Sequence, residues 1–335
     1  MSEVIERHES EPAPLKIADV FPGQGFVPRE LVGTARGLFN SPKAERVLTH
    51  IDAILGPIFP GIRVFSDLIL NGSEEEVAQL SETENAQPAV LAVSMASVAA
   101  LEEFGQEVES PFAVSGHSAG IVGALWRAGA LGRMEALWLA RERGEAIRDA
   151  KKGRKPGAMA AVTNREPIDI GGLEKICSEF NVELVNLNSP MQIVVSGRLE
   201  DVVSAGAGIK FAGHRVTSLS TSDAFHHSEL MKPAVELFAK SVDRVKINDP
   251  KVPVYLNSTG QPLAMGRDIT RFLPGEIAKP VDWVSVVNNM KARGISAFRE
   301  FGHGSVLTGL VKRINPDAKL ANIGSIEQAK SQPFQ

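Results

Sequence analysis

The residues of this sequence best suited to chemistry are Gly116-His117-Ser118-Ala119-Gly120. The apolar run 111–115 precedes them, and the helix-like run 121–126 follows them. This context predicts a nucleophile elbow, in which a serine on a tight strand-to-helix turn is held exposed at the end of a sheet. The flanking glycines would let neighbouring backbone come close, and the N–H of Ala119 can face a developing oxyanion. The alternative is a small-residue turn that only packs a helix on a strand.

A serine hydroxyl is a weak nucleophile until a base takes its proton, so a histidine is needed close to Ser118. The chain has seven histidines, and spacing alone does not select one of them. The best placed are His226 and His227, because their loop leads into a helix predicted from about Ser228 to Ala239. His117 adjoins the serine and should point away from it. From position alone, a surface or helix-capping role for His226 or His227 is as well supported as catalysis.

The surrounding segments predict an α/β fold with an α/β-hydrolase-like large subdomain that contains a parallel sheet. Gln87–Phe104 is expected to form a long core helix, and Arg133–Ala150 a helix that could bring one polar side chain into the site. Strands are expected over 15–21, 252–256, 297–301 and 320–323. We assign residues 15–156 and 221–335 to this large catalytic subdomain.

The segment 157–220 has a different rhythm and is expected to form a small inserted subdomain. Its predicted elements are a strand over 158–162, a helix over 173–180, strands over 182–185 and 192–195, a helix over 199–209 and a strand over 215–219. That order, βαββαβ, is the order of a ferredoxin-like unit. Residues 1–14 are charged and proline-containing without periodicity, so we expect a disordered tail there.

Composition excludes several classes of protein. The net charge of −4 on 335 residues argues against nucleic-acid binding, which usually needs a basic face. No apolar run approaches the roughly 18 residues that a membrane span needs, so we expect no membrane contact and a cytoplasmic protein. The single cysteine, Cys177, allows neither an intrachain disulfide nor a cysteine metal cluster, and it is expected to be a small buried apolar residue.

Seven short motifs then occur in an order that a known family shares. They are Phe21-Pro22-Gly23-Gln24-Gly25, Gln87-Pro88-Ala89, Gly116-His117-Ser118-Ala119-Gly120, Asn188-Ser189-Pro190 with Gln192, His227-Ser228-Glu229-Leu230-Met231, Asn257-Ser258-Thr259-Gly260 and Gly302-His303-Gly304-Ser305-Val306-Leu307. With them the chain resembles the malonyl-CoA:acyl-carrier-protein transacylases, including the free-standing acyltransferases of polyketide synthases. The resemblance runs from about Ala18 to Ile314.

The resemblance assigns roles to individual residues. It implies that Ser118 is the nucleophile and His227 its base, and that the backbone N–H groups of Gln24 and Ala119 form the oxyanion hole. It also implies that Arg143 holds the free carboxylate of a malonyl-type acyl group, for which a bidentate guanidinium is well suited. Gln87, Asn188 and His226 are expected to contact substrate, and Glu276 is expected to orient His227.

The implied reaction is two acyl transfers through one intermediate. Ser118 would take the acyl group from an acyl-CoA, and the phosphopantetheine thiol of an acyl carrier protein would then take it from the ester, with His227 as acid and base. Such a reaction needs no metal and no redox cofactor. The acyl group and the carrier protein are not specified by the sequence, nor is fatty-acid or polyketide assembly.

Several positions depart from the family pattern. Glu276 stands where a glutamine is usual, so His227 could be oriented by its backbone carbonyl or by its carboxylate. His226 occupies a position linked to acyl-group choice. The pair Phe26-Val27 replaces the usual Ser-Gln, and His303 stands where proline is common. These differences leave the choice of acyl group open.

Three alternatives remain at this stage. The same scaffold could hydrolyse acyl groups from carrier proteins, although a carboxylate anchor at Arg143 suits a dicarboxylic donor better. An ordinary α/β-hydrolase esterase would use Ser118, Asp223 and His227 in that order. A non-catalytic carrier-protein docking module is the third. The basic run 151–155 could steer CoA phosphates or an acidic carrier protein, or it could be a solvated loop.

Overall fold

The computed structural model describes residues 15–25, 27–55, 64–105, 110–219, 228–331 and 334. The predicted tail 1–14 lies outside these residues. His227, the predicted base, and His226, at the position linked to acyl-group choice, also lie outside these residues.

The larger of two sheets has six strands in the order β11-β10-β1-β2-β7-β8. Their bounds are β1 Ile17–Phe21, β2 Ala113–Gly116, β7 Val254–Tyr255, β8 Pro262–Leu263, β10 Ala297–Phe301 and β11 Lys319–Ile323. All neighbouring strands run parallel except β8, which pairs with β7 antiparallel at one edge. The expected parallel sheet is therefore present, with one antiparallel edge strand.

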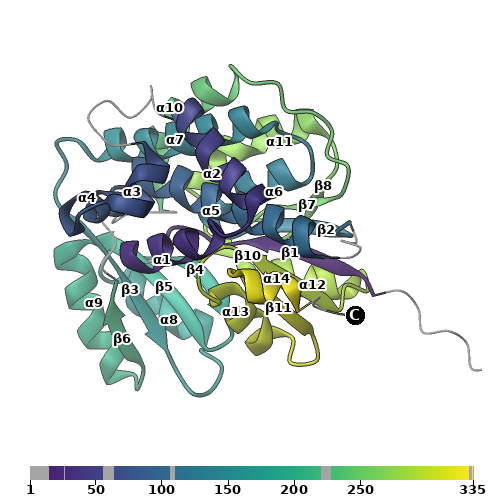
Figure 1. Ribbon diagram of the computed structural model, residues 1–335. Helices are drawn as coiled ribbons and strands as arrows, with labels where there is room; N and C mark the ends of the chain where they lie inside the picture. The colour runs from purple at the N-terminus through teal and green to yellow at the C-terminus, as the bar shows by residue number, and fades with distance from the viewer. Residues whose placement is uncertain are drawn as a thin grey trace, which may run out of the picture.

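Helices cover both faces of this sheet, as Figure 1 shows. On one face lie α5 (Thr83–Phe104), α6 (Ile121–Arg127) and α7 (Arg133–Lys151), and on the other α12 (Trp283–Ala292) and α13 (Val306–Ile314). Successive side chains of a strand point to opposite faces, so β1 contributes to two cores. Phe21 packs with the α5 and α7 side, whereas Ala18 and Val20 pack with α12 and α13.

The remaining helices extend these layers. They are α1 (Pro28–Leu38), α2 (Pro42–Leu55), α3 (Phe65–Asn71), α4 (Glu74–Ala78), α10 (Lys232–Val242), α11 (Gly266–Phe272) and α14 (Ile326–Lys330), with short 3₁₀ turns at Gln79–Ser81, Ser118–Gly120, Glu229–Met231 and Leu273–Ile277. Within the described residues, no helix is both long and apolar enough to cross a membrane.

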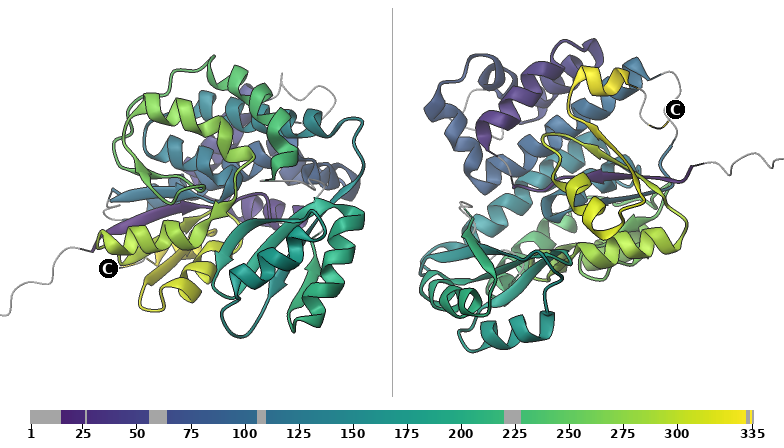
Figure 2. Two further views of the ribbon diagram at one scale, coloured as in Figure 1. Left: turned by 180° about the vertical axis from the view of Figure 1, so that it is seen from behind. Right: turned by 90° about the horizontal axis from the view of Figure 1, so that it is seen from below.

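The smaller sheet has five strands in the order β6-β3-β5-β4-β9. Four of them, β3 (Gly157–Thr163), β4 (Glu183–Ser189), β5 (Gln192–Arg198) and β6 (Arg215–Ser218), alternate with α8 (Ile170–Ser178) and α9 (Leu199–Phe211) in the predicted βαββαβ order. The fifth, β9 (Val281–Asp282), comes from beyond residue 220 and pairs in parallel with β4. The fold is thus α/β with two sheets, both of them mixed. Figure 2 shows the smaller sheet beside the larger layer.

The helix α5 begins earlier than the sequence predicts. The helix begins at Thr83, four residues before Gln87, and Pro88 lies inside it. A proline inside a helix leaves the carbonyl four residues earlier without its N–H partner. Here that carbonyl belongs to Glu84, and the Arg141 guanidinium on α7 donates to it at 3.2 Å. A contact across two helices therefore permits a helix start that the local sequence argues against.

Three sequence motifs meet at one edge of the large sheet because they follow parallel neighbouring strands. Residues 22–25 follow β1, residues 117–120 follow β2, and residues 302–304 follow β10. Ligands of open α/β sheets bind at the carboxyl ends of the strands. This edge is therefore where the predicted site residues should gather.

Candidate active site

Ser118 has the backbone of a nucleophile elbow. Its φ is +52°, a left-handed conformation that is uncommon for a residue with a side chain and is often found at functional sites. A Cβ on Gly116 would lie 2.0 Å from the Gly120 carbonyl carbon, and one on Gly120 would lie 2.1 Å from the Phe21 oxygen. Both positions therefore require glycine because backbone passes too close for any side chain.

Asn257 fixes this strained turn from the side of β7. The Ser118 N–H donates to Asn257 Oδ1 at 3.1 Å, and Asn257 is only 1% exposed. Glu276 in turn holds Asn257, since one carboxylate oxygen accepts the N–H groups of Asn257 at 2.8 Å and Ser258 at 3.2 Å. The other oxygen accepts the Ser258 hydroxyl. The Glu276 carboxylate therefore supports the nucleophile through Asn257.

Arg143 reaches the nucleophile from α7. It is fully buried, and its guanidinium donates to Gln87 Oε1 at 2.9 Å and to Ser118 Oγ at 3.4 Å. The close approach of α7 to α5 depends on Gly144, where a Cβ would lie 2.5 Å from the Glu84 Cα. Arg143 is therefore not an exposed charge on the face of α7, because tight helix packing turns this side chain inward.

A chain of hydrogen bonds extends from Arg143 to the loop after β1. Gln87 Nε2 donates to Thr83 Oγ1 at 2.9 Å, and the Thr83 hydroxyl donates to Gln24 Oε1 at 2.9 Å. The side chains of Gln87 and Gln24 therefore order one another and the arginine. The bond from Thr83 ties the Gln24 side chain, and with it the loop after β1, to α5.

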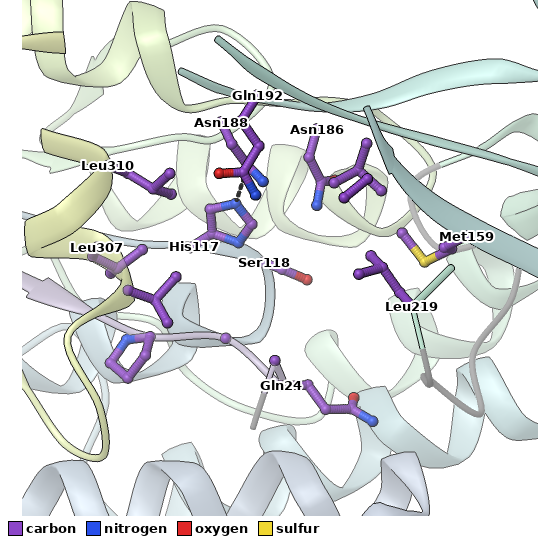
Figure 3. Close-up of a pocket in the computed structure, with 16 residues that line it drawn as sticks. Gln24, His117, Ser118, Met159, Asn186, Asn188, Gln192, Leu219, Leu307 and Leu310 are labelled. Atoms are coloured by element: carbon purple, nitrogen blue, oxygen red, sulfur yellow. Dashed lines mark hydrogen bonds between the residues drawn. The ribbon is translucent and has the colours of Figure 1, made fainter. Parts of the chain in front are cut away.

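His117 points away from the nucleophile, as expected from its place next to Ser118. Its Nε2 lies 2.8 Å from Asn188 Oδ1 on β4, and Figure 3 shows the ring directed towards Asn188 while the Ser118 hydroxyl faces open space. Burial lowers the pKa of His117, although the hydrogen bond to Asn188 acts in the opposite direction. His117 thereby links the elbow to the smaller sheet.

Ser118 opens into a cavity of about 180 Å³ between the two sheets. The loop after β1 and the elbow form one side, and the ends of β3, β4 and β5 with α13 form the other. The walls from these elements include Gln24, His117, Met159, Ala161, Asn186, Asn188, Gln192, Val194, Leu219, Leu307 and Leu310. A serine with an adjacent guanidinium, in a cavity with apolar walls, can bind an acyl chain that ends in an anion.

Three of the predicted residues, Gln24, Gln87 and Arg143, meet around Ser118, and the others do not join them directly. Arg143 and Asn257 contact it, Gln87 contacts Arg143, and Gln24 lines the same cavity. Asn188 lies on the far wall and holds His117. Ala119 follows the nucleophile and is 8% exposed. Thr83 and Asn257 were not predicted to belong to the site, although the motif Asn257-Ser258-Thr259-Gly260 was a signal for Asn257.

The contacts of Glu276 predict the outcome of a neutral substitution. A glutamine could accept both N–H groups with one oxygen and donate its amide to the Ser258 hydroxyl. Glu276→Gln should therefore keep acylation of Ser118 within about threefold of wild type. Glu276→Ala should slow it more, because the N–H groups of Asn257 and Ser258 lose their acceptor, at about 1–3 kcal/mol each.

Single-turnover acylation near neutral pH measures both variants. A drop of roughly a hundredfold in the glutamine variant would mean that the negative charge stabilises the catalytic imidazolium, as a triad aspartate does. Of the two alternatives for Glu276, we expect its backbone carbonyl to orient His227, which lies outside the described residues.

His303 predicts a pH dependence of stability. It is 3% exposed in the loop after β10, and burial lowers its pKa to about 4. Below about pH 6.5 the unfolded chain then binds more protons than the folded one. The contribution of His303 to the free energy of unfolding is therefore fully present above that pH and falls as the pH is lowered towards 4. Between pH 7 and pH 5, the free energy of unfolding of His303→Gln, measured in urea, should fall by about 2 kcal/mol less than that of the wild-type protein. Parallel pH curves would contradict this assignment.

Comparison with known proteins agrees with this geometry. The family model described as the acyl transferase domain matches residues 20–312. The malonyl CoA-acyl carrier protein transacylase of Bacillus subtilis (strain 168) is 36% identical over 316 residues, which cover 93% of this chain and 94% of that one. By its sequence and its fold, this chain belongs to the acyl transferase family, as the seven motifs indicated.

Solved structures narrow the relationship. The acyl-carrier-protein S-malonyltransferase of Bartonella henselae superposes with a TM-score of 0.84 at 31% identity, covering 95% of this chain and 98% of that one. A malonyl-transacylase solved in complex with its type II polyketide synthase acyl-carrier protein gives a TM-score of 0.85 at 30% identity, covering 95% and 99%. The resemblance to the malonyl-CoA:acyl-carrier-protein transacylases is thereby confirmed, and the chain is an acyltransferase.

Proposed function

We propose that this enzyme transfers a malonyl group from coenzyme A to the phosphopantetheine thiol of an acyl carrier protein, through an ester on Ser118. The observation that carries the proposal is the buried Arg143 guanidinium 3.4 Å from Ser118 Oγ. A malonyl thioester attacked by Ser118 would carry its free carboxylate close to that charge. The names of the relatives, which are malonyl transacylases, support the same substrates.

In the first half-reaction the Ser118 hydroxyl attacks the thioester carbonyl while His227 takes its proton. The carbonyl oxygen becomes negatively charged and is held by the N–H groups of Gln24 and Ala119. Collapse of the tetrahedral intermediate breaks the C–S bond, and His227 gives its proton to the CoA thiolate. The carrier thiol then attacks the ester in the reverse sense, and the proton returns to Ser118.

The surrounding residues hold these groups in place. Gln87 orients Arg143, Asn257 fixes the Ser118 backbone, and Asn188 holds His117 away from the nucleophile. We assign Gln87, Asn188 and His226 to the acyl pocket and the Glu276 carbonyl to His227. The chemistry involves only proton and acyl transfer.

The proposal includes the division of the chain. We assign 15–156 and 221–335 to an α/β-hydrolase-like subdomain, and 157–220 to a ferredoxin-like one, with 1–14 as a disordered tail. The antiparallel pairing of β3 with β5 and β6 supports the second subdomain. We also propose a cytoplasmic location, because both proposed substrates, malonyl-CoA and the acyl carrier protein, are water-soluble.

A transfer assay tests this function. The protein is mixed with malonyl-CoA and a holo acyl carrier protein, and intact-mass spectrometry follows malonyl-carrier and free malonate. We expect malonyl-carrier to form much faster than malonate. Faster release of malonate would indicate a hydrolase, and neither product would indicate a docking module.

A further inference from the structure

Thr83 is a buried residue in the first turn of α5, and the proposed mechanism gives it no part. A threonine at such a place usually turns its hydroxyl to nearby backbone or to water. Here the residue is only 1% exposed, and its hydroxyl bonds two side chains instead. It accepts from Gln87 Nε2 at 2.9 Å and donates to Gln24 Oε1 at 2.9 Å. Thr83 therefore joins the loop after β1 to the side chain that contacts Arg143.

Arg143 fixes the direction of the bonds in this chain. A guanidinium has donors and no acceptor, so Gln87 must turn its Oε1 to Arg143, which donates to it at 2.9 Å. The Gln87 Nε2 then points away from the arginine and needs an acceptor, which is the Thr83 oxygen. A Gln87 amide turned the other way would put its NH₂ group against the guanidinium. The Thr83 oxygen thus favours the one amide orientation in which Arg143 is held.

The packing of α7 on α5 keeps the Thr83 hydroxyl at a fixed place relative to Arg143. Thr83 and Gln87 are four residues apart, so they lie on the same face of α5. A Cβ on Gly144, the residue after Arg143, would lie 2.6 Å from the Thr83 carbonyl oxygen. The two helices therefore touch through their backbones at Thr83, next to the residue that carries the guanidinium.

We propose that Thr83 is a positioning residue that sets the preference of the site for an acyl group ending in a carboxylate. This inference rests on the proposed function. By accepting from Gln87, Thr83 keeps the Gln87 carbonyl on Arg143 and so holds the guanidinium where it meets the malonyl carboxylate. An acyl group without a carboxylate does not use the guanidinium. It should depend on Thr83 only through the bond to Gln24.

Thr83→Val tests this role, because valine has nearly the same shape and lacks the hydroxyl. Single-turnover acylation of Ser118 is measured with malonyl-CoA and acetyl-CoA in parallel. We expect the malonyl rate to fall roughly 30-fold and the acetyl rate no more than about threefold, so that their ratio falls about tenfold. Thr83→Ser keeps the hydroxyl and should hold the ratio within about threefold of wild type. If the valine variant does not fold, Thr83→Ala, which also lacks the hydroxyl, takes its place.

Ser97→Ala is the matched control, because it removes a buried hydroxyl from the same helix. The Ser97 hydroxyl donates to the Val93 carbonyl at 2.9 Å within α5, and Ser97 is not among the described residues that line the cavity. A general weakening of the helix would affect both donors equally in this variant. The ratio of malonyl to acetyl acylation should therefore stay at the wild-type value.

A double variant shows whether Thr83 acts through the arginine. Thr83→Val combined with Arg143→Ala should have the same ratio of malonyl to acetyl acylation as Arg143→Ala alone, because the guanidinium that Thr83 positions is already absent. A further fall of the ratio in the double variant would overturn the proposal. So would equal losses for the two donors in Thr83→Val, or a serine variant that behaves like the valine one.

NMR of the arginine side chains tests the coupling without turnover. In protein with ¹⁵N-labelled arginine, the guanidinium signals that disappear in Arg143→Ala belong to Arg143. We expect these signals to shift in Thr83→Val, to stay near their wild-type positions in Thr83→Ser and to be unchanged in Ser97→Ala. Unchanged signals in Thr83→Val would overturn the proposal. Shifted signals in a protein whose wild type transfers no malonyl group would contradict the proposed function and not the positioning of Arg143 by Thr83.

Discussion

Ser118→Ala should form no acyl-enzyme and should lower malonyl transfer by roughly 10⁴-fold or more, because the only atom removed is the nucleophilic oxygen. The fold should survive. The Ser118 N–H still donates to Asn257, and the lost hydroxyl leaves little space unfilled. We expect the free energy of unfolding to change by less than about 1 kcal/mol. Intact-mass spectrometry after incubation with malonyl-CoA measures the adduct, and urea unfolding measures stability.

The neighbouring Ser115 provides a control for this variant. Its hydroxyl is buried and donates to the Tyr255 carbonyl at 2.9 Å, so Ser115→Ala removes a serine oxygen from β2, the strand that leads to the elbow, without touching the cavity. We expect that variant to lose some stability and to keep its malonyl adduct. A full adduct on the Ser118 variant would instead place the nucleophile elsewhere.

Arg143→Ala should change which acyl groups the enzyme accepts. Loss of a charge-assisted contact to the malonyl carboxylate should cost about 1.5–3 kcal/mol, or roughly 10-fold to 150-fold in kcat/KM for malonyl-CoA. Acetyl-CoA has no carboxylate and should lose much less. The variant should also be less stable, since Gln87 loses its donor in a buried site. Kinetics with the two donors side by side measure the selectivity.

Arg148→Ala is the matched control, because it removes an arginine from the same helix. Arg148 pairs with Glu84 at 3.0 Å and with Asp149 at 2.9 Å, and it does not contact Ser118. Its loss should leave the ratio of malonyl to acetyl transfer unchanged. Equal losses for malonyl and acetyl donors in Arg143→Ala would contradict the carboxylate role.

The sequence could predict those features that depend on neighbouring residues. The elbow follows from two glycines around a serine between a strand and a helix, and the βαββαβ order follows from local periodicity. The small buried character expected of Cys177 is also confirmed, since it is 1% exposed and burial raises the pKa of its thiol to about 11. In these places local pattern and tertiary structure agree.

The missed features depend on contacts between distant segments. The predicted helix over 87–104 begins four residues too late, because the Glu84 carbonyl that Pro88 leaves without an N–H partner accepts the Arg141 guanidinium on α7. Thr83 joins Gln24 to Gln87 through a pair of hydrogen bonds that no local pattern announces. The strand β9 joins the smaller sheet from more than sixty residues beyond the other four strands. Tertiary contacts override local preference in each case.

The central claim is that one malonyl group waits on Ser118 between two thiols. The direct measurement is peptide mapping of the wild-type protein after brief exposure to malonyl-CoA, before and after addition of holo carrier protein. We predict one malonyl group per chain, confined to the peptide with Ser118, and its quantitative appearance on the carrier. A malonyl group on another residue, or malonyl-carrier formed without any Ser118 ester, would contradict the account.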